Sequence, residues 1–437
     1  MGVTINRFRR KQLGWSPNSK KYVCAACVKD DALAQVVRAH VARRRCDFCR
    51  AISDHSIAAP VNAVTQHMAM CFESQFGNPT WEYPHVQLAM PIPRFPHDIP
   101  GIRLPAMDSH QLLYRTMTAE VSCGLFNELA MAFRRQQWCY KVAFLTQEQR
   151  LGRSWELFKN MVKHERRYTF WSSSDADTPS VDRDWNPHTL PGGKTLHAIG
   201  ESIRVCGLIR KLPAGTRLWR ARTHRDVELI ASGKDLSSPP TSAAVNANRM
   251  SPSGIPMFYG AEDLETARAE AIDPKDMSKT QVTAGMFRLM KHIQILDLVD
   301  LPPCPSIFDL ERTTWRHACE FLRGFSWDVA EPIVRDGREH IEYVPTQAFT
   351  EFVRYQLRTY KDEAIQGIRY QSARSRGRRL AVDVVLFFKQ EHCIESDNLF
   401  RSPCVQMLKF DDKSIRRELI DHAFYQREAE REYEIPF

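Results

Sequence analysis

Two Cys-x-x-Cys pairs place the tightest local constraint on how this chain can fold. Cys24 and Cys27 form the first pair, Cys46 and Cys49 form the second, and the stretch from Asp30 to Arg43 between them has a helical pattern. Each short loop can point two sulfurs toward one ion, so this spacing is typical of a tetrahedral structural zinc site. Two chance turns with free thiols remain the alternative. A redox function is less favoured, because nothing like a thioredoxin strand and helix surrounds either pair.

The rest of the composition indicates a soluble protein of several domains. The chain has 437 residues, of which 43% are hydrophobic and 26% charged, so it exceeds one compact core and is not disordered. No apolar run approaches the roughly 20 residues of a membrane-spanning helix, and the basic N-terminus lacks the apolar core of a signal peptide. Most other cysteines are scattered singly among apolar residues, which is typical of free thiols in a reducing compartment. We therefore expect a cytoplasmic protein without a membrane partner.

The periodicity changes along the chain in a way that predicts its organisation. Between Ile57 and Phe170 apolar residues recur at helical spacing, with a Pro-rich loop expected from Met90 to Pro105. The stretch Trp171–Thr195 is dense in Ser, Asp, Pro and Gly and marks a domain boundary. We expect a basic tail (1–20), a zinc finger (21–55), a helical domain (56–170), a linker (171–195), a mixed domain (196–395) and a charged C-terminal helix (396–437).

Helices and strands are mixed after the linker without a regular βαβ order. Strands are predicted at TRLWRAR, at His292–Leu301 and at LAVDVVLFF, and helices at KTLHAIGESIRVCGLIRKL and from Val344. The segment Asn248–Ile272 reads as a turn, a short strand and a helix starting near Glu262 or Asp263. The fold class is therefore multidomain α+β, with a zinc finger and helices followed by a mixed sheet.

Three separated stretches carry residues suited to an anionic nucleotide. Arg220 lies in a predicted strand, Arg249, Tyr259 and Glu270 lie in the turn, strand and helix that follow, and Ser372 lies in the late stretch GIRYQSAR. Guanidinium groups can clamp phosphate oxygens, an aromatic ring can stack on a base, and a carboxylate can stabilise a developing cation. The same residue types form ordinary surface ion pairs in most chains, so spacing alone leaves that alternative open.

The order of these motifs resembles the RES domain over about residues 200–395. Arg220 is followed by R-x-S-x-x-G-x-P-x-x-Y, by T-A-x-x-E and by the GIRYQS stretch before an apolar strand. The resemblance implies an ADP-ribosyltransferase-like fold. It implies a catalytic Arg220, Glu270 and Ser372, with Arg249, Tyr259, Tyr370 and Gln347 around the substrate NAD. Ala221 departs from the aromatic residue that many members carry after the first arginine.

RES proteins characterised as toxins cleave the nicotinamide glycosidic bond of NAD, so the resemblance implies an NAD glycohydrolase or phosphorylase. Glu270 would then stabilise an oxocarbenium-like ribose, and the arginines would neutralise the diphosphate. Ser372 would contribute an orienting hydroxyl group and not a covalent nucleophile, since no G-x-S-x-G elbow surrounds it. A loop serine that caps a backbone amide is the alternative for this residue. Protein ADP-ribosyl transfer also stays open.

The zinc finger and helices before this region resemble the HEPN/RES N-terminal domain. HEPN relatives that cut RNA carry an Arg followed by four to six residues and then a His, and the near matches here are Arg50 with His55 and Lys159 with His164. RNA binding or cleavage, with an inactive RES domain, is therefore the alternative function. The net charge of +9 is compatible with nucleic acid but not specific for it. An antitoxin or sensing partner and a homodimer are further expectations.

Overall fold

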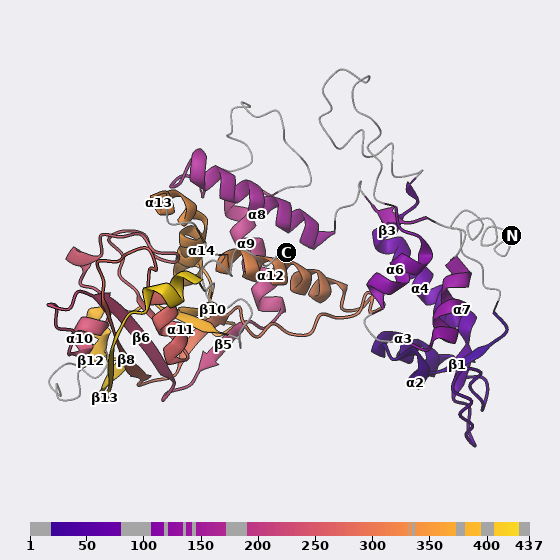
Figure 1. The fold of residues 1–437 in the computed structure, drawn as a ribbon. Helices are drawn as coiled ribbons and strands as arrows, with labels where there is room; N and C mark the ends of the chain where they lie inside the picture. The colour runs from indigo at the N-terminus through magenta and orange to yellow at the C-terminus, as the bar shows by residue number, and fades with distance from the viewer. Residues whose placement is uncertain are drawn as a thin grey trace. The chain divides into compact units, whose positions relative to one another are not determined.

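The structure is a computed structural model. It describes residues 19–79, 106–117, 121–133, 137–141, 146–171, 190–331, 333, 337–372, 381–394 and 406–427. The chain forms two compact units, shown as ribbons in Figure 1. The first comprises Met1–Arg150, Ser180–Thr189 and Pro303–His317, and the second comprises Leu151–Pro179, Leu190–Pro302 and Ala318–Phe437. The predicted Pro-rich loop, residues 1–18 of the predicted basic tail and residues 172–189 of the predicted linker lie outside the described residues.

The first unit is mainly helical, as its apolar periodicity predicts. Its elements are β1 (Tyr22–Cys24), α2 (Ala25–Val28), α3 (Asp31–Ala39), β2 (Ala58–Pro60), α4 (Val61–Gln75), β3 (Phe76–Gly77), α6 (Ser109–Thr116), α7 (Cys123–Phe133) and β4 (Cys139–Tyr140). The short strands pair antiparallel, β1 with β2 and β3 with β4. Phe72 of α4 is the centre of an aromatic core, with edge contacts to Phe133, Trp138 and Phe308 at 5.4 to 5.7 Å between ring centroids.

The second unit is built on a nine-stranded sheet in the order β12-β13-β8-β6-β7-β11-β10-β9-β5. The strands are β5 (Ile209–Leu212), β6 (Arg217–His224), β7 (Phe258–Ala261), β8 (Gln281–Leu289), β9 (Ile293–Asp297), β10 (Ile365–Gln371), β11 (Val382–Leu386), β12 (Cys393–Ile394) and β13 (Leu408–Leu419). Its helices include α9 (Gly192–Val205), α10 (Gly233–Leu236), α11 (Leu264–Ala271), α13 (Glu339–Glu342) and α14 (Val344–Tyr355). Helices α8 (Gln147–His164) and α12 (Thr313–Ala330) contribute most of their residues to this unit. Short 3₁₀ turns occupy Thr241–Ala243 and Gln390–His392.

The sheet is mixed, which confirms the α+β prediction. Strands β9 and β10 pair in parallel, as do β12 and β13, whereas the other neighbours run antiparallel. Strands β6 and β7 are joined at a single pair, Trp219 with Ala261. One face of the sheet carries an apolar core that includes Leu218, Phe258, Phe287 and Phe410.

The predicted turn, strand and helix between residues 248 and 272 are confirmed. The turn includes Gly254, whose φ of +86° lies in the left-handed region that glycine adopts without strain. Strand β7 follows, and α11 begins after Asp263, whose carboxylate accepts a hydrogen bond from the Thr266 amide at 2.8 Å. This N-cap fixes the start of the helix, and so places Glu270 in its last turn.

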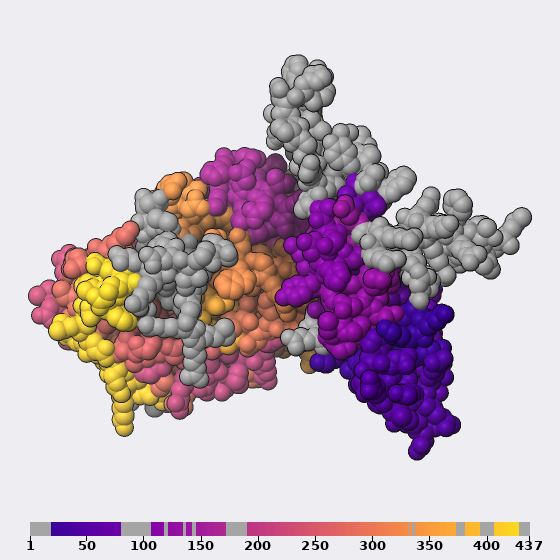
Figure 2. Space-filling model, turned by 45° about the vertical axis from the view of Figure 1, so that its right-hand side comes forward, coloured from indigo at the N-terminus to yellow at the C-terminus, as the bar shows by residue number. Residues whose placement is uncertain are grey.

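The prediction of a helix across the C-terminal segment is wrong for residues 408–419, which form strand β13. Leu408 and Phe410 are buried against β8, where Phe410 pairs with Phe287. The apolar residues Ile415 and Leu419 suggested a helical stripe, but Leu419 is 79% exposed. Pairing with β8 therefore overrides the local pattern. The residues drawn in yellow in Figure 2 include the exposed side chains of this strand. Residues 422–427 are helical.

The described helices are all too short or too polar to cross a bilayer.

Candidate functional site

Glu270 and Ser372 come together although they are far apart in the sequence. Glu270 lies in the last turn of α11, and Ser372 directly follows β10. The Ser372 hydroxyl donates a hydrogen bond to Oε1 of Glu270. Ser372 is only 2% exposed, so this bond is shielded from water. The hydroxyl therefore holds one carboxylate oxygen and leaves the rest of the carboxylate for another partner.

A second acid, Asp383, completes this contact and was missed in the sequence. It lies on β11 opposite Tyr370, is 7% exposed, and its side chain hydrogen-bonds with Glu270 and Ser372. Burial and then the charge of Glu270 raise the pKa of Asp383 well above its usual range. The signal was available: Asp383 is the one charged residue in the run VDVVL, in which every residue is buried.

Two tyrosines lie beside these acids. Burial, followed by the charges of Asp383 and Glu270, raises the pKa of Tyr370 well above its usual range. The Tyr259 hydroxyl lies 2.9 Å from the Ser251 hydroxyl, and burial raises the pKa of Tyr259 to about 12. Both phenols therefore stay neutral and can donate hydrogen bonds at physiological pH.

Arg220 meets Tyr259 through the main chain, and the strand register places its side chain on the sheet face of Phe258, opposite to that of Asp383 and Tyr370. Its Nη1 donates to the Tyr259 carbonyl at 2.8 Å, and its guanidinium lies 5.3 Å from the centroid of the Phe258 ring. Burial and the neighbouring Arg222 lower the pKa of Arg220 to about 9. Within the described part of the chain its buried Nε has no hydrogen-bond acceptor. A half-buried cation with an unused donor is suited to binding an anion.

Arg249 is held by main-chain carbonyls. Its Nη1 donates to the carbonyls of Val329 at 3.0 Å and Glu331 at 2.5 Å, and its guanidinium lies 5.8 Å from the Tyr343 ring centroid. Its positive charge still acts on the acid pair, because it lowers the pKa of Asp383 against the larger effect of burial. Part of the hydrogen-bonding capacity of the Arg249 guanidinium is therefore taken up by these main-chain carbonyls.

Gln347 supports the loop that carries Arg249. Its Nε2 donates to the carbonyls of Asn248 at 2.9 Å and Ser251 at 3.3 Å, and Gln347 is 8% exposed. Thr346, beside it on α14, donates to the Arg249 carbonyl at 2.5 Å. Both side chains therefore fix the backbone around the site, and the Gln347 amide nitrogen is engaged with that backbone.

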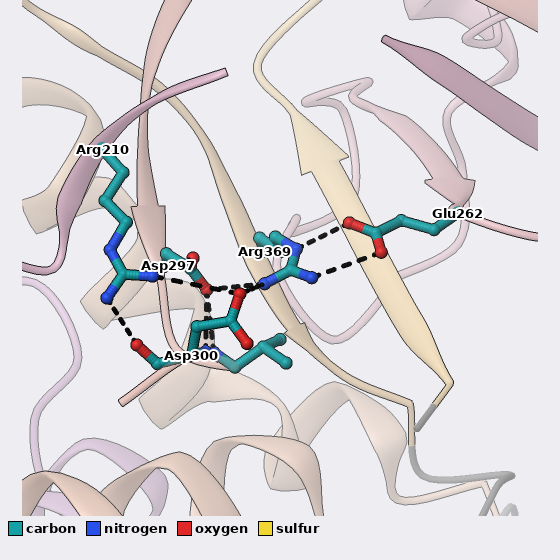
Figure 3. Close-up of polar contacts among 6 residues, drawn as sticks. Arg210, Glu262, Asp297, Asp300 and Arg369 are labelled. Carbon is teal, nitrogen blue, oxygen red and sulfur yellow. Dashed lines mark hydrogen bonds and ion pairs between the residues drawn. The ribbon is translucent and has the colours of Figure 1, made fainter. Parts of the chain in front are cut away.

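An ion network fixes the strand that carries Tyr370 (Figure 3). Arg369 of β10 lies between Glu262, at 2.6 Å, and the acids Asp297 and Asp300, at 3.1 and 2.8 Å. Arg210 of β5 also pairs with Asp297, at 3.0 Å. Hydrogen bonds and charges from Glu262 and Asp297 outweigh burial and raise the pKa of Arg369. The network joins β5, β9, β10 and the end of β7.

The four predicted zinc ligands converge. The Sγ atoms of Cys24, Cys27, Cys46 and Cys49 all lie within 4.8 Å of one another, and three of their separations are 3.6, 3.6 and 3.7 Å. A zinc–sulfur distance of about 2.3 Å in a tetrahedron corresponds to about 3.8 Å between sulfurs. Burial acts to raise the pKa of Cys46, but backbone amides of Cys49, Phe48 and Cys24 lower it to about 7. This four-cysteine cluster is consistent with a structural zinc site.

The residues of the two near matches to an RNA-cutting Arg–His pair have ordinary surroundings: they are exposed or form an ion pair. Arg50 and His55 are exposed, and Nδ1 of His55 lies 3.0 Å from the Ser53 hydroxyl. The ammonium of Lys159 pairs with Asp328 at 2.7 Å. His164, in the last turn of α8, is exposed.

Comparison with known families agrees with this arrangement. Residues 217–399 match the RES domain, and residues 39–176 match HEPN/RES N-terminal domain 1. The chain therefore carries a RES domain and a HEPN/RES N-terminal domain, and both predicted resemblances are confirmed. The RES domain defines a family of toxins with NAD-related activity. No curated protein matches the chain.

Proposed function

We propose that this protein is an NAD-consuming enzyme that cleaves the bond between nicotinamide and ribose. The observation that supports this best is the contact of Glu270 with Ser372 and Asp383, at the end of the strand pair β10–β11 in the RES domain. A carboxylate held by neutral donors in a largely buried site suits a reaction that develops positive charge on a sugar.

Each residue has a role that follows from its surroundings. Cleavage makes the ribose oxocarbenium-like, so Glu270 stabilises the transition state more than the ground state. Arg220, with its unused Nε, binds a phosphate oxygen of the diphosphate, and Arg249 adds positive charge nearby. Tyr259 and Tyr370 offer rings and hydroxyls to the substrate. Ser372 orients Glu270 and forms no covalent intermediate.

The direct test is release of nicotinamide from NAD by the purified protein. We expect Glu270→Gln to reduce the rate about a hundredfold or more, which corresponds to about 2.7 kcal/mol of transition-state stabilisation. Glu265→Gln is the matched control, because Glu265 lies on the same helix and its side chain is 78% exposed. Normal turnover by the Glu270→Gln variant would refute the role of Glu270.

The acceptor of the ADP-ribosyl group decides the reaction class. Water, phosphate and a protein side chain enter the same vacated ribose face, and each gives a product of different mass. Mass analysis of the products with and without added phosphate therefore separates hydrolysis, phosphorolysis and protein modification. We favour hydrolysis or phosphorolysis, with a toxin or defence role.

The first unit supplies the remaining parts of the proposal. We infer that the four-cysteine cluster holds one structural zinc ion, and that this unit senses or restrains the enzyme, alone or with an antitoxin. RNA cleavage is less well supported, because the ammonium of Lys159 is engaged in ion pairs with Asp328 and Glu156.

A further inference from the structure

Asp383 is an acid in a place where ionisation is costly. All five residues of β11 are buried, and the strand has a neighbour on each side, β7 and β10. An ionised carboxylate there loses its hydration and must be compensated by nearby donors or cations. A carboxyl group at this position therefore carries a clear energetic cost, which indicates a function beyond packing.

Among the residues that the structure describes, the groups that face Asp383 come from several elements. Glu270 comes from α11, Tyr370 from β10, and Ser372 from the end of β10, whereas Arg249 comes from the loop before β7. The second tyrosine, Tyr259 of β7, interacts with Tyr370. Of these groups only Arg249 is cationic, and its Nη1 already donates to two carbonyls. One cation cannot compensate two adjacent carboxylates, so the pair favours a single negative charge.

We propose that Asp383 is a positioning residue that keeps its proton at neutral pH and donates it in a hydrogen bond to the Glu270 carboxylate. Glu270 then receives two donors, the Ser372 hydroxyl and the Asp383 carboxyl, and carries the one negative charge of the pair. The catalytic consequence rests on the proposed function, whereas the location of the proton does not.

Two arguments favour Asp383 as the residue that holds the proton. It is the more deeply buried acid, since Glu270 at the end of its helix is only partly buried. Burial and then Glu270 also raise the pKa of Asp383 well above its usual range. The proton is not consumed in the reaction. When the carbon–nitrogen bond breaks, its electron pair neutralises the positive nicotinamide ring, and the leaving group needs no proton. Asp383 therefore fixes the direction of the Glu270 lone pairs toward the ribose.

This arrangement predicts a pH dependence with a definite sign. As the pH rises through the raised pKa of Asp383, the pair gains a second negative charge and loses its internal hydrogen bond. Turnover then falls at alkaline pH. An Asp383→Asn variant keeps a neutral donor of the same shape, so we expect its rate at neutral pH to stay within about threefold of the wild type and its alkaline limb to be lost. Asp383→Leu removes the donor, and we expect a loss of about tenfold or more.

Infrared spectroscopy of the whole protein locates the proton without relying on turnover. We expect a carbonyl band of a buried protonated carboxyl group at neutral pH that shifts in D₂O. The band should disappear in Asp383→Asn and persist in Glu270→Gln, where burial still holds the proton on Asp383. The control Asp362→Asn replaces an exposed acid at φ +61°, which Asn tolerates, and should leave the band unchanged.

Two results would overturn the proposal. The first is loss of the band in Glu270→Gln, which would place the proton on Glu270. The second is an Asp383→Asn rate as low as that of Glu270→Gln in a protein that is folded by circular dichroism, which would mean that the charge of Asp383 is required. Absence of nicotinamide release by the wild type would refute the proposed function alone, and the infrared result would still decide the position of the proton.

Discussion

Burial determines what each ionisable side chain near Glu270 can contribute. Burial disfavours the charged form of both Arg220 and Asp383, but the two side chains respond to it in different ways. The guanidinium keeps its positive charge and an unused Nε, so it gains from an arriving anion. The carboxyl group avoids the cost by keeping its proton. Neutral donors thus contact the Glu270 carboxylate, and among the described residues the Nε of Arg220 has no acceptor.

The unused donor of Arg220 leads to a binding prediction. We expect ADP-ribose to raise the melting temperature of the wild type, since a ligand at about a hundred times its Kd stabilises a protein by about 2.7 kcal/mol. Arg220→Gln should lose this shift, because it removes the cation that we propose as the partner of the diphosphate. Arg217→Gln is the control, since Arg217 is exposed on the same strand. An equal shift in Arg220→Gln, measured by differential scanning fluorimetry, would contradict this role.

Several site residues can be found from the sequence, and Asp383 shows why others cannot. Glu270 and Ser372 stand in motifs whose order is distinctive, so their meeting can be expected before any coordinates. Asp383 stands in an apolar run and looks like part of a strand. Its significance depends on which residue faces it across the sheet, and that register is set by pairing with Tyr370. Likewise, the use of Arg249 by two carbonyls depends on tertiary contacts.

At the scale of elements, the site depends on how the strands are held together. The strands β9 and β10 run parallel, and the ion network on Arg369 ties them to β5 and to Glu262 after β7. Asp297 is 4% exposed. Its carboxylate accepts hydrogen bonds from Arg210, from Arg369 and from two backbone amides. Such a network costs desolvation energy, but it fixes the register of β10 beside Tyr370.

Breaking this network should destabilise the second unit. We expect Arg369→Gln to lower the free energy of unfolding by about 3 kcal/mol, because Asp297 and Glu262 lose a cation while Asp297 stays buried. Arg288→Gln, at an exposed position of β8, should change it by less than about 0.5 kcal/mol. Urea unfolding followed by circular dichroism measures both. An Arg369→Gln midpoint equal to that of the control would show that the network adds no stability.

The four-cysteine cluster gives a prediction for the first unit. We expect one zinc ion per purified chain by elemental analysis, and we expect Cys46→Ser to lose it, because Cys46 is fully buried among the other thiols. Zinc binding in small fingers supplies on the order of 10 kcal/mol, so a chelator should lower the melting temperature of the wild type. Cys123→Ser changes an exposed cysteine outside the cluster and should keep the metal. Protein free of zinc but equally stable would contradict the structural role.

Helices and strands could be predicted where the local sequence pattern agrees with the observed burial. They could not be predicted where pairing with a distant strand overrides that pattern. The Asp263 cap and the preceding turn give α11 its start, so this helix could be read from the sequence. Strand β13 has charged residues between its apolar ones and resembles a solvated helix. Its conformation is decided by β8, more than a hundred residues earlier in the chain. Such long-range pairing leaves little trace in a local pattern.

At the scale of the whole molecule, one chain joins a HEPN/RES N-terminal domain to a RES domain. The sequence predicts both from motif order and from cysteine spacing. The acceptor of the reaction and the partner of the first unit could not be predicted, because they depend on groups outside the chain. A cellular experiment can nevertheless separate an enzyme that acts on NAD from a protein that acts through nucleic acid.

We expect induced expression of the wild-type chain in bacterial cells to lower the NAD pool and then arrest growth. The order matters, because NAD loss is the cause in the proposed function. Glu270→Gln should restore both NAD and growth at equal protein level, since it removes the charge that stabilises the ribosyl cation. Glu265→Gln, exposed on the same helix, should remain toxic. NAD measured by an enzymatic cycling assay and protein measured by immunoblot give the comparison. Growth arrest by Glu270→Gln with an intact NAD pool would assign the toxicity to another part of the chain, and salt-dependent RNA binding would then be the property to measure.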